Sequence, residues 1–137
     1  MNEVALFAYG TLMLPEVMHA LVGRRVDGVS AILNGYIRRR IRGESFPGIV
    51  QGEGSVTGIV YAGIDVEELE RLDDFESDFY DRVDLSDAIS ADCAAPVLGY
   101  VVAPRYRELM SNEDWDLEHF RRVHLQRYVS GIADGSL

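Results

Sequence analysis

The order in which strand-like and helix-like segments follow one another constrains the fold of this chain more than any other feature. Six short runs have the apolar or alternating pattern of strands, at residues 4–9, 29–33, 36–41, 55–61, 79–85 and 96–102. Helical patterns follow only the first run, the fourth run and the last. Because this order is neither a strict alternation of strands and helices nor all-β, we expect an α+β fold with a mainly antiparallel or mixed sheet.

Helix ends are marked by residues with strong positional preferences. Pro15 is typical of a first helical turn, and Gly23 of a helix stop. Asp65 is suited to cap a second helix, and the glutamate three residues later completes a capping box. Apolar side chains recur at helical spacing over Trp115–Val129, which predicts one amphipathic C-terminal helix. Residues 130–137 have no such period, and we expect a tail there.

Two glycine-containing segments predict turns and loops. Asn34 and Gly35 join two strand-like runs, and this pair favours the type I′ turn of a β-hairpin, where both central residues need φ > 0. The glycine-rich stretch from Gly43 to Gly54 is expected to be an irregular loop over the sheet. Such loops often line pockets, so this one is a candidate for the wall of a binding site.

Length and charge limit the class of protein. The 137 residues suit a single domain, 1–137. A formal net charge of −10 opposes binding to nucleic acid, which needs a cationic face. No apolar run approaches the roughly 20 residues of a membrane span, and the N-terminal segment does not resemble a secretory signal. We therefore expect a cytoplasmic protein without nucleic-acid or membrane partners; the oligomeric state is not specified.

The reactive side chains exclude several mechanisms. All 13 basic residues other than histidine are arginines, so no lysine serves a Schiff base or a phosphate-binding loop. Cys93 is the sole cysteine and has no basic neighbour in sequence, and we expect an inert thiol. His119 and His124 are five residues apart, which places them on different faces of one helix and disfavours a metal site.

Three segments remain as candidates for chemistry, each with a structural alternative. The backbone amides from Gly10 to Leu12 follow a strand and could converge on an anion or oxyanion, although a purely structural turn has the same pattern. Glu76 follows an apolar helix face, where partial burial would raise its pKa, although it also belongs to a run of carboxylates that could simply be solvated. Arg38, Arg40 and Arg42 share one strand face and either bind an anion or pair with surplus carboxylates.

Four segments in this order resemble the AIG2-like branch of the γ-glutamylcyclotransferase-like family. They are Phe7-Ala8-Tyr9-Gly10-Thr11-Leu12-Met13, Phe46-Pro47-Gly48-Ile49-Val50, Leu72-Asp73-Asp74-Phe75-Glu76 with Tyr80-Asp81-Arg82, and Trp115-Asp116-Leu117-Glu118-His119-Phe120-Arg121. The resemblance extends from Val4 to about Tyr128. It implies a compact, mixed, barrel-like sheet with helices packed outside.

The resemblance also implies a function and a site. The implied reaction is cyclisation of a γ-glutamyl amine or amino acid to 5-oxoproline with release of the amine, which requires no metal or organic cofactor. By matching position Glu76 would be the catalytic acid/base, and the substrate-binding residues would be Tyr9, Gly10, Thr11, Leu12 and Tyr80. The alternative is a non-catalytic module that keeps the small-molecule pocket and binds or signals without turnover.

One position departs from the family pattern. The family usually has glycine after this glutamate, whereas this chain has Ser77. If the backbone there needs φ > 0, the serine Cβ restricts it. The serine at position 77 could therefore change where the backbone places the neighbouring side chain of Glu76.

Overall fold

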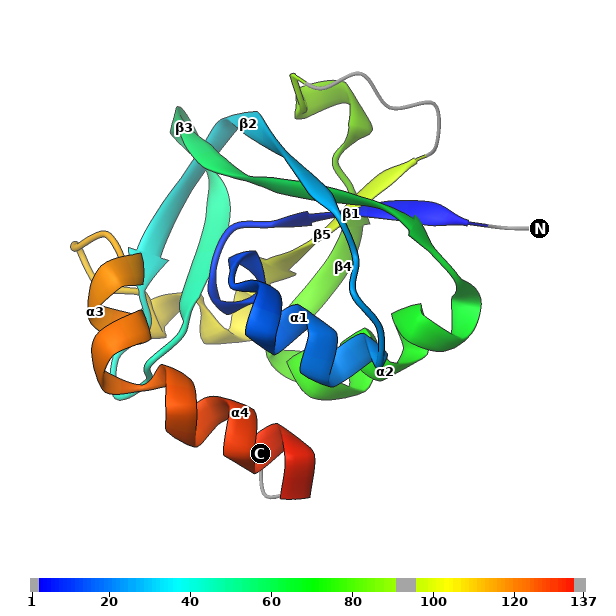
Figure 1. Ribbon diagram of the computed structural model, residues 1–137. Helices are drawn as coiled ribbons and strands as arrows, with labels where there is room; N and C mark the ends of the chain where they lie inside the picture. The colour runs from blue at the N-terminus through cyan, green and yellow to red at the C-terminus, as the bar shows by residue number, and fades with distance from the viewer. Residues whose placement is uncertain (1–2, 91–95, 135–137) are drawn as a thin grey trace.

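The computed structural model describes residues 3–90 and 96–134, and in this part of the chain five strands form one mixed sheet (Figure 1). The strands are β1 (Val4–Ala8), β2 (Gly28–Arg40), β3 (Pro47–Ile64), β4 (Tyr80–Asp84) and β5 (Val97–Val102). Their spatial order is β2-β3-β1-β5-β4, with β1 parallel to β5 and the other neighbours antiparallel. The expected α+β fold with a mixed sheet is thus confirmed.

Four α-helices and four short 3₁₀ segments occupy the rest of the described chain. The α-helices are α1 (Pro15–Val22), α2 (Val66–Glu76), α3 (Leu117–Val123) and α4 (Leu125–Asp134). The 3₁₀ segments are η1 (Thr11–Met13), η2 (Ser77–Phe79), η3 (Ser86–Ala88) and η4 (Pro104–Leu109). Helices α1, α2 and α4 gather on one side of the sheet (Figure 1).

The predicted ends of α1 and α2 are confirmed. Pro15 occupies the first turn of α1, and Gly23 ends that helix with φ of +83°, in the left-handed region where glycine is favoured. The Asp65 side chain accepts a hydrogen bond from the Glu68 amide, and the Glu68 side chain accepts one from the Asp65 amide. This capping box fixes where α2 begins, and therefore where Glu76 falls at its other end.

Strand β1 lies in the middle of the sheet and is buried on both faces. Leu6 and Ala8 pack into the core beneath the helices. Phe7 and Tyr9 belong to a second core on the opposite face. A strand covered on both sides reads as a continuous apolar run rather than an alternating one, which matches the sequence of this segment.

The sheet curls so that the segment after β4 approaches β2. Leu33 of β2 forms an isolated antiparallel bridge with Ile89, and the Ser90 amide donates to the Ile32 carbonyl oxygen at 3.0 Å. These contacts connect the two edges of the sheet and enclose the second core. The curled sheet corresponds to the expected barrel-like form.

The predicted hairpin at Asn34-Gly35 was wrong, because both residues lie inside the continuous strand β2. Asn34 pairs with Ser55 and Tyr36 with Gln51, and the register shifts between these pairs. Gly35 has φ of +80°, so the positive φ that suggests a turn is used in a β-bulge instead. The connection between β2 and β3 comes later, at residues 41–46, where Gly43 has φ of +79°.

The predicted irregular loop from Gly43 to Gly54 was wrong from Pro47 onward, where β3 begins. Gly48 shows why a glycine here does not mean a loop. A Cβ on Gly48 would lie 2.2 Å from a methyl carbon of Val102 on β5, so this glycine permits close packing within the curled sheet.

The C-terminal region forms two helices rather than the single predicted one. His124, with φ of −116°, separates α3 from α4. The expected tail was also wrong for Ser130 to Asp134, which continue α4. The break brings the rings of His119 and His124 to a centroid distance of 5.6 Å, whereas an unbroken helix would have separated them.

Candidate active site

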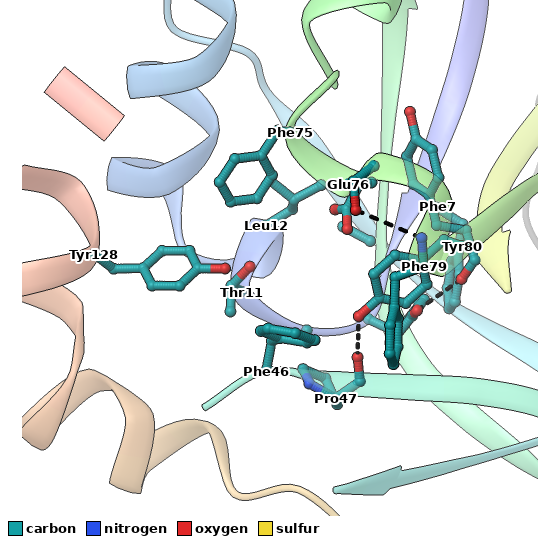
Figure 2. Close-up of a pocket in the computed structure, with 15 residues that line it drawn as sticks. Phe7, Thr11, Leu12, Phe46, Pro47, Phe75, Glu76, Phe79, Tyr80 and Tyr128 are labelled. Carbon is teal, nitrogen blue, oxygen red and sulfur yellow. Dashed lines mark hydrogen bonds between the residues drawn. The ribbon is translucent and has the colours of Figure 1, made fainter. Parts of the chain in front are cut away.

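A cavity of about 220 Å³ opens where the segment after β1 meets the end of α2 (Figure 2). Residues from β3, β5 and α4 complete its wall. All six predicted site residues line it: Tyr9, Gly10, Thr11, Leu12, Glu76 and Tyr80. Eight of its fifteen lining residues are aromatic, and Glu76 is the one with a carboxyl group. The structure thus brings together residues far apart in sequence around one small, mostly apolar space.

The segment from Tyr9 to Leu12 is held by contacts to its carbonyl groups. Arg38 donates to the Tyr9 carbonyl oxygen at 2.8 Å, and the Tyr61 hydroxyl donates to the Leu12 carbonyl oxygen at 2.7 Å. Thr11 and Leu12 begin the 3₁₀ turn η1, whose first amides have no partner within the turn. No hydrogen bond within residues 3–90 and 96–134 engages these two amides, so they can serve a ligand.

Gly10 is required at its position by the space available rather than by a left-handed backbone. Its φ is −131°, so the segment does not depend on a left-handed turn there. A Cβ on Gly10 would instead lie 2.6 Å from Cγ of Pro47 on β3. The glycine is therefore needed for the close approach of two backbone segments that both line the cavity.

Glu76 is the last residue of α2, and its half-buried side chain enters the cavity (Figure 2). Burial, followed by the nearby charge of Asp73, raises the pKa of this carboxyl group from 4.5 to about 8. The Glu76 charge in turn raises the pKa of Tyr9, Tyr80 and Tyr128, for which burial is the larger cause. The carboxyl group thus lies among the aromatic side chains and titrates near neutral pH.

Ser77 follows Glu76 with φ of 61° and ψ of −165°, a region of backbone space essentially restricted to glycine. It is the one non-glycine residue with positive φ in the described part of the chain. The backbone after Glu76 therefore does need φ > 0, which is the case in which the Cβ of Ser77 restricts the backbone. The backbone still turns after Glu76 and leads into η2.

Asp73 lies one helical turn before Glu76 and is held by two partners. The Tyr100 hydroxyl donates to Asp73 Oδ1 at 2.7 Å, and Arg82 forms an ion pair with Asp73 Oδ2. Sequence reasoning grouped Asp73 with the solvated carboxylates and did not single it out. The available signal was its helical spacing of three residues from Glu76, which places both side chains on one face of α2.

The two tyrosines predicted to bind substrate use their hydroxyl groups within the protein. Tyr9 donates to the Tyr100 carbonyl oxygen at 2.7 Å, and Tyr80 donates to the Pro47 carbonyl oxygen at 2.6 Å. Burial is the main reason that the pKa of each lies well above 10. Both side chains form part of the cavity wall.

Sequence reasoning missed the contribution of α4. Tyr128 lines the cavity, and its hydroxyl points toward Thr11 (Figure 2). The sequence indicated only that Tyr128 lies on the apolar face of a helix, and its ring does pack on Phe120 and Phe75. Its place at the cavity depends on the helix break at His124, which the periodicity did not reveal.

The remaining candidates lie away from this cavity. Arg38 pairs with Asp114 at 2.8 Å and Arg40 with Glu113 at 3.7 Å, which confirms pairing with carboxylates for these two residues. Arg42 lies beyond the end of β2 and forms no ion pair with a described residue. Cys93 lies outside the described residues. Within the described ranges, no three His, Cys, Asp or Glu side chains form a group suited to a metal ion. None of the helices described is both long and apolar enough to cross a membrane.

Comparison with known proteins identifies the family. The family model described as gamma-glutamyl cyclotransferase, AIG2-like, matches residues 6–117. The chain belongs to this family. AIG2-like protein C of Arabidopsis thaliana is 47% identical over 78 residues, which cover 56% of this chain and 45% of that relative, so the match spans less than half of the relative's length. Protein AIG2 C of the same plant is 33% identical over 126 residues, covering 90% of this chain and 75% of that one.

Solved structures support the same assignment of fold. The solution structure of an Arabidopsis thaliana protein superposes with a TM-score of 0.69 at 28% identity, covering 99% of this chain and 94% of that one. A chain named gamma-glutamyl cyclotransferase superposes with a TM-score of 0.58 at 16% identity, covering 96% of this chain and 86% of that one. At this identity the second likeness concerns the fold alone.

Proposed function

We propose that this AIG2-like protein is an enzyme that cyclises a γ-glutamyl amine or amino acid to 5-oxoproline and releases the amine. The observation that carries the proposal is the position of Glu76, whose carboxyl group enters an aromatic cavity that is also lined by Thr11 and Leu12, the residues with unpartnered amides. Membership of a family described by this activity supports the assignment.

In the proposed reaction the nucleophile belongs to the substrate. Ionised Glu76 accepts a proton from the substrate's α-ammonium group, and the free amine then attacks the γ-carbonyl carbon. The new carbon–nitrogen bond closes a five-membered ring and leaves a tetrahedral oxyanion. As the oxyanion collapses, Glu76 returns its proton to the leaving nitrogen and the bond to that nitrogen breaks, while the ring nitrogen loses its second proton to solvent and becomes the lactam nitrogen. The products are 5-oxoproline and the free amine, without net oxidation or reduction.

The surrounding residues would hold the substrate in a folded geometry. The Thr11 and Leu12 amides are donors suited to the α-carboxylate or to the developing oxyanion. The mostly aromatic wall favours a bent, compact substrate in a space of about 220 Å³. Positioning two reacting ends in this way can supply about 7 to 11 kcal/mol of a barrier, so one carboxyl group and a few amides are chemically sufficient.

The pKa of Glu76 suits both proton transfers. A value of about 8 lies near neutral pH, where a group can accept and return a proton with little loss in either direction. When the substrate's ammonium group binds beside it, the opposite charge favours the ionised carboxylate. The same burial that makes the free carboxyl group a weak acid thereby makes the bound carboxylate a useful base.

The direct experiment is incubation of the purified protein with a panel of γ-glutamyl amines and γ-glutamyl amino acids. We expect release of 5-oxoproline and of an equal amount of amine from at least one compound, measured by chromatography and mass spectrometry. Saturable binding of panel members without any product would instead favour the non-catalytic module, and would overturn the proposed activity.

A further inference from the structure

A second cavity adjoins the proposed active site on the side of α4. It has a volume of about 530 Å³, and three of its lining residues, Phe46, Phe75 and Tyr128, also line the first cavity. The two spaces therefore share a wall of aromatic rings. The larger cavity is therefore the neighbouring space that has room for a leaving group.

The second cavity contains a cation that the first lacks. Arg127 of α4 lines it, together with His124 and Glu44 on the connection between β2 and β3. Arg127 is exposed and forms no ion pair with any residue of the described chain. Glu44 also forms no ion pair within 4.0 Å with any residue of the described chain. The guanidinium group is thus available to a ligand.

Another cavity that adjoins the proposed active site is lined by more carboxylates. This cavity of about 480 Å³ shares Ser77, Tyr80 and Tyr100 with the first. Its charged lining residues are Asp73, Asp81 and Arg82, and Arg82 is already paired with Asp73. An anionic leaving group would be repelled there. In a chain with a net charge of −10, a local unpaired arginine is needed to accept such a group.

We propose that the cavity lined by Arg127 is the leaving-group subsite, and that Arg127 selects γ-glutamyl compounds whose leaving amine bears a free carboxylate. This inference rests on the proposed cyclisation. An amino acid joined through its α-amine has that carboxylate and no other charge on its backbone. Glu44, on the facing segment, disfavours a second negative charge on the side chain, so the preferred leaving group is a neutral or basic amino acid.

Two compounds of the same size test this subsite, γ-glutamyl-alanine and its C-terminal amide. We expect the wild type to prefer the carboxylate, and Arg127→Gln to raise KM for it by about two- to fivefold, the range for one exposed charge pair. For the amide, KM should change by less than twofold, and kcat should change little for either compound. Arg127→Lys should restore part of the preference, because the charge is kept.

Arg122→Gln is the matched control. Arg122 is an exposed arginine of α3 that lines neither cavity, so its substitution removes the same charge without touching the subsite. An equal loss of preference in Arg122→Gln and Arg127→Gln would attribute the effect to net charge and overturn the inference. Equal KM values of the wild type for the two compounds, unchanged in Arg127→Gln, would also overturn it while leaving the proposed cyclisation intact.

Binding to Glu76→Gln separates this inference from the reaction itself. Calorimetric titration of both compounds into this variant should show the same preference for the carboxylate, because Arg127 does not depend on proton transfer. If the wild type cyclises neither compound, the proposed activity fails for them, and the ratio of the two dissociation constants still decides the subsite. A ratio near one contradicts it.

Discussion

Glu76 is an acid whose ionisation is opposed by its surroundings. Its carboxyl group lies among aromatic rings, and Asp73, which forms an ion pair with Arg82, lies one helical turn away on α2. Both influences favour the protonated form, and burial is the larger. The cost of ionising Glu76 should therefore be visible in the stability of the free protein as well as in its activity.

The direction in which pH changes the free energy of unfolding follows from how many protons Glu76 binds in the folded and in the unfolded state. Because the pKa of Glu76 is about 8 in the folded protein and 4.5 in an ordinary environment, the folded state binds more protons between these values. Its stabilising contribution is complete below about pH 4.5 and is lost as the pH rises through 8. Glu76→Gln removes this titration. Relative to the wild type, its free energy of unfolding should rise by about 2 kcal/mol or more between pH 5 and pH 9.

Urea denaturation of both proteins across this pH range measures the difference. Parallel stability curves for the wild type and Glu76→Gln would mean that Glu76 ionises as freely in the folded protein as in the unfolded chain. The raised pKa, and with it the account of Glu76 as a group poised near neutrality, would then be wrong.

The sequence alone did not distinguish Glu76 from the carboxylates beside it. By composition, Glu76 could not be told from its acidic neighbours, and only the family resemblance singled it out. The structure separates them: Glu76 enters the cavity, whereas Asp78 is exposed and pairs with Arg105 at 3.4 Å. The difference depends on how the end of α2 and the turn into η2, which contains Asp78, lie against the curled sheet. That arrangement is a tertiary property that a run of charges does not encode.

At the scale of elements, the end of α2 is the most constrained feature of the site. Ser77 has φ of 61° and ψ of −165°, and a side chain in this region costs about 1–3 kcal/mol. Ser77→Gly should therefore stabilise the protein by about 1 kcal/mol, after the greater flexibility of glycine in the unfolded chain is subtracted. Chemical denaturation at fixed pH measures the change.

Ser77→Ala is the control for this substitution. It removes the same hydroxyl group, whose contact with the Phe79 amide is long at 3.5 Å, but keeps the Cβ that causes the strain. We expect no stabilisation from alanine. A free energy of unfolding that is the same for the glycine and alanine variants would contradict the assignment of strain to this position.

The ends of helices could be predicted from residues close by in the sequence. The course of the strands could not, because it depends on pairing between distant segments. The ends of α1 and α2 are determined by Pro15, Gly23 and the capping box at Asp65, all of which act within a few residues. Asn34-Gly35 has an equally strong local signal, yet the long pairing of β2 with β3 converts a predicted hairpin into a bulge. Glycines such as Gly48 suggest a loop locally, while close packing in the sheet requires them.

At the scale of the whole molecule, the sheet order explains why one cavity collects these residues. The central strand β1 lies between β3 and β5, so the segment that follows it is flanked by Pro47 on one side and Tyr100 on the other. Helix α2 then brings Glu76 to the same place. The sequence predicted an α+β class, but not this strand order or the contribution of Tyr128 from α4, because both depend on contacts between distant segments.

The central claim is that Glu76 transfers the protons of cyclisation, and the turnover of Glu76→Gln tests it most directly. On a γ-glutamyl compound that the wild type converts, kcat for 5-oxoproline release should fall by about 10²- to 10⁴-fold, because glutamine has the size of glutamate but cannot accept the ammonium proton. Asp78→Asn, an exposed neighbour in the same acidic run, should retain the wild-type kcat. Equal turnover by the two variants would contradict the account.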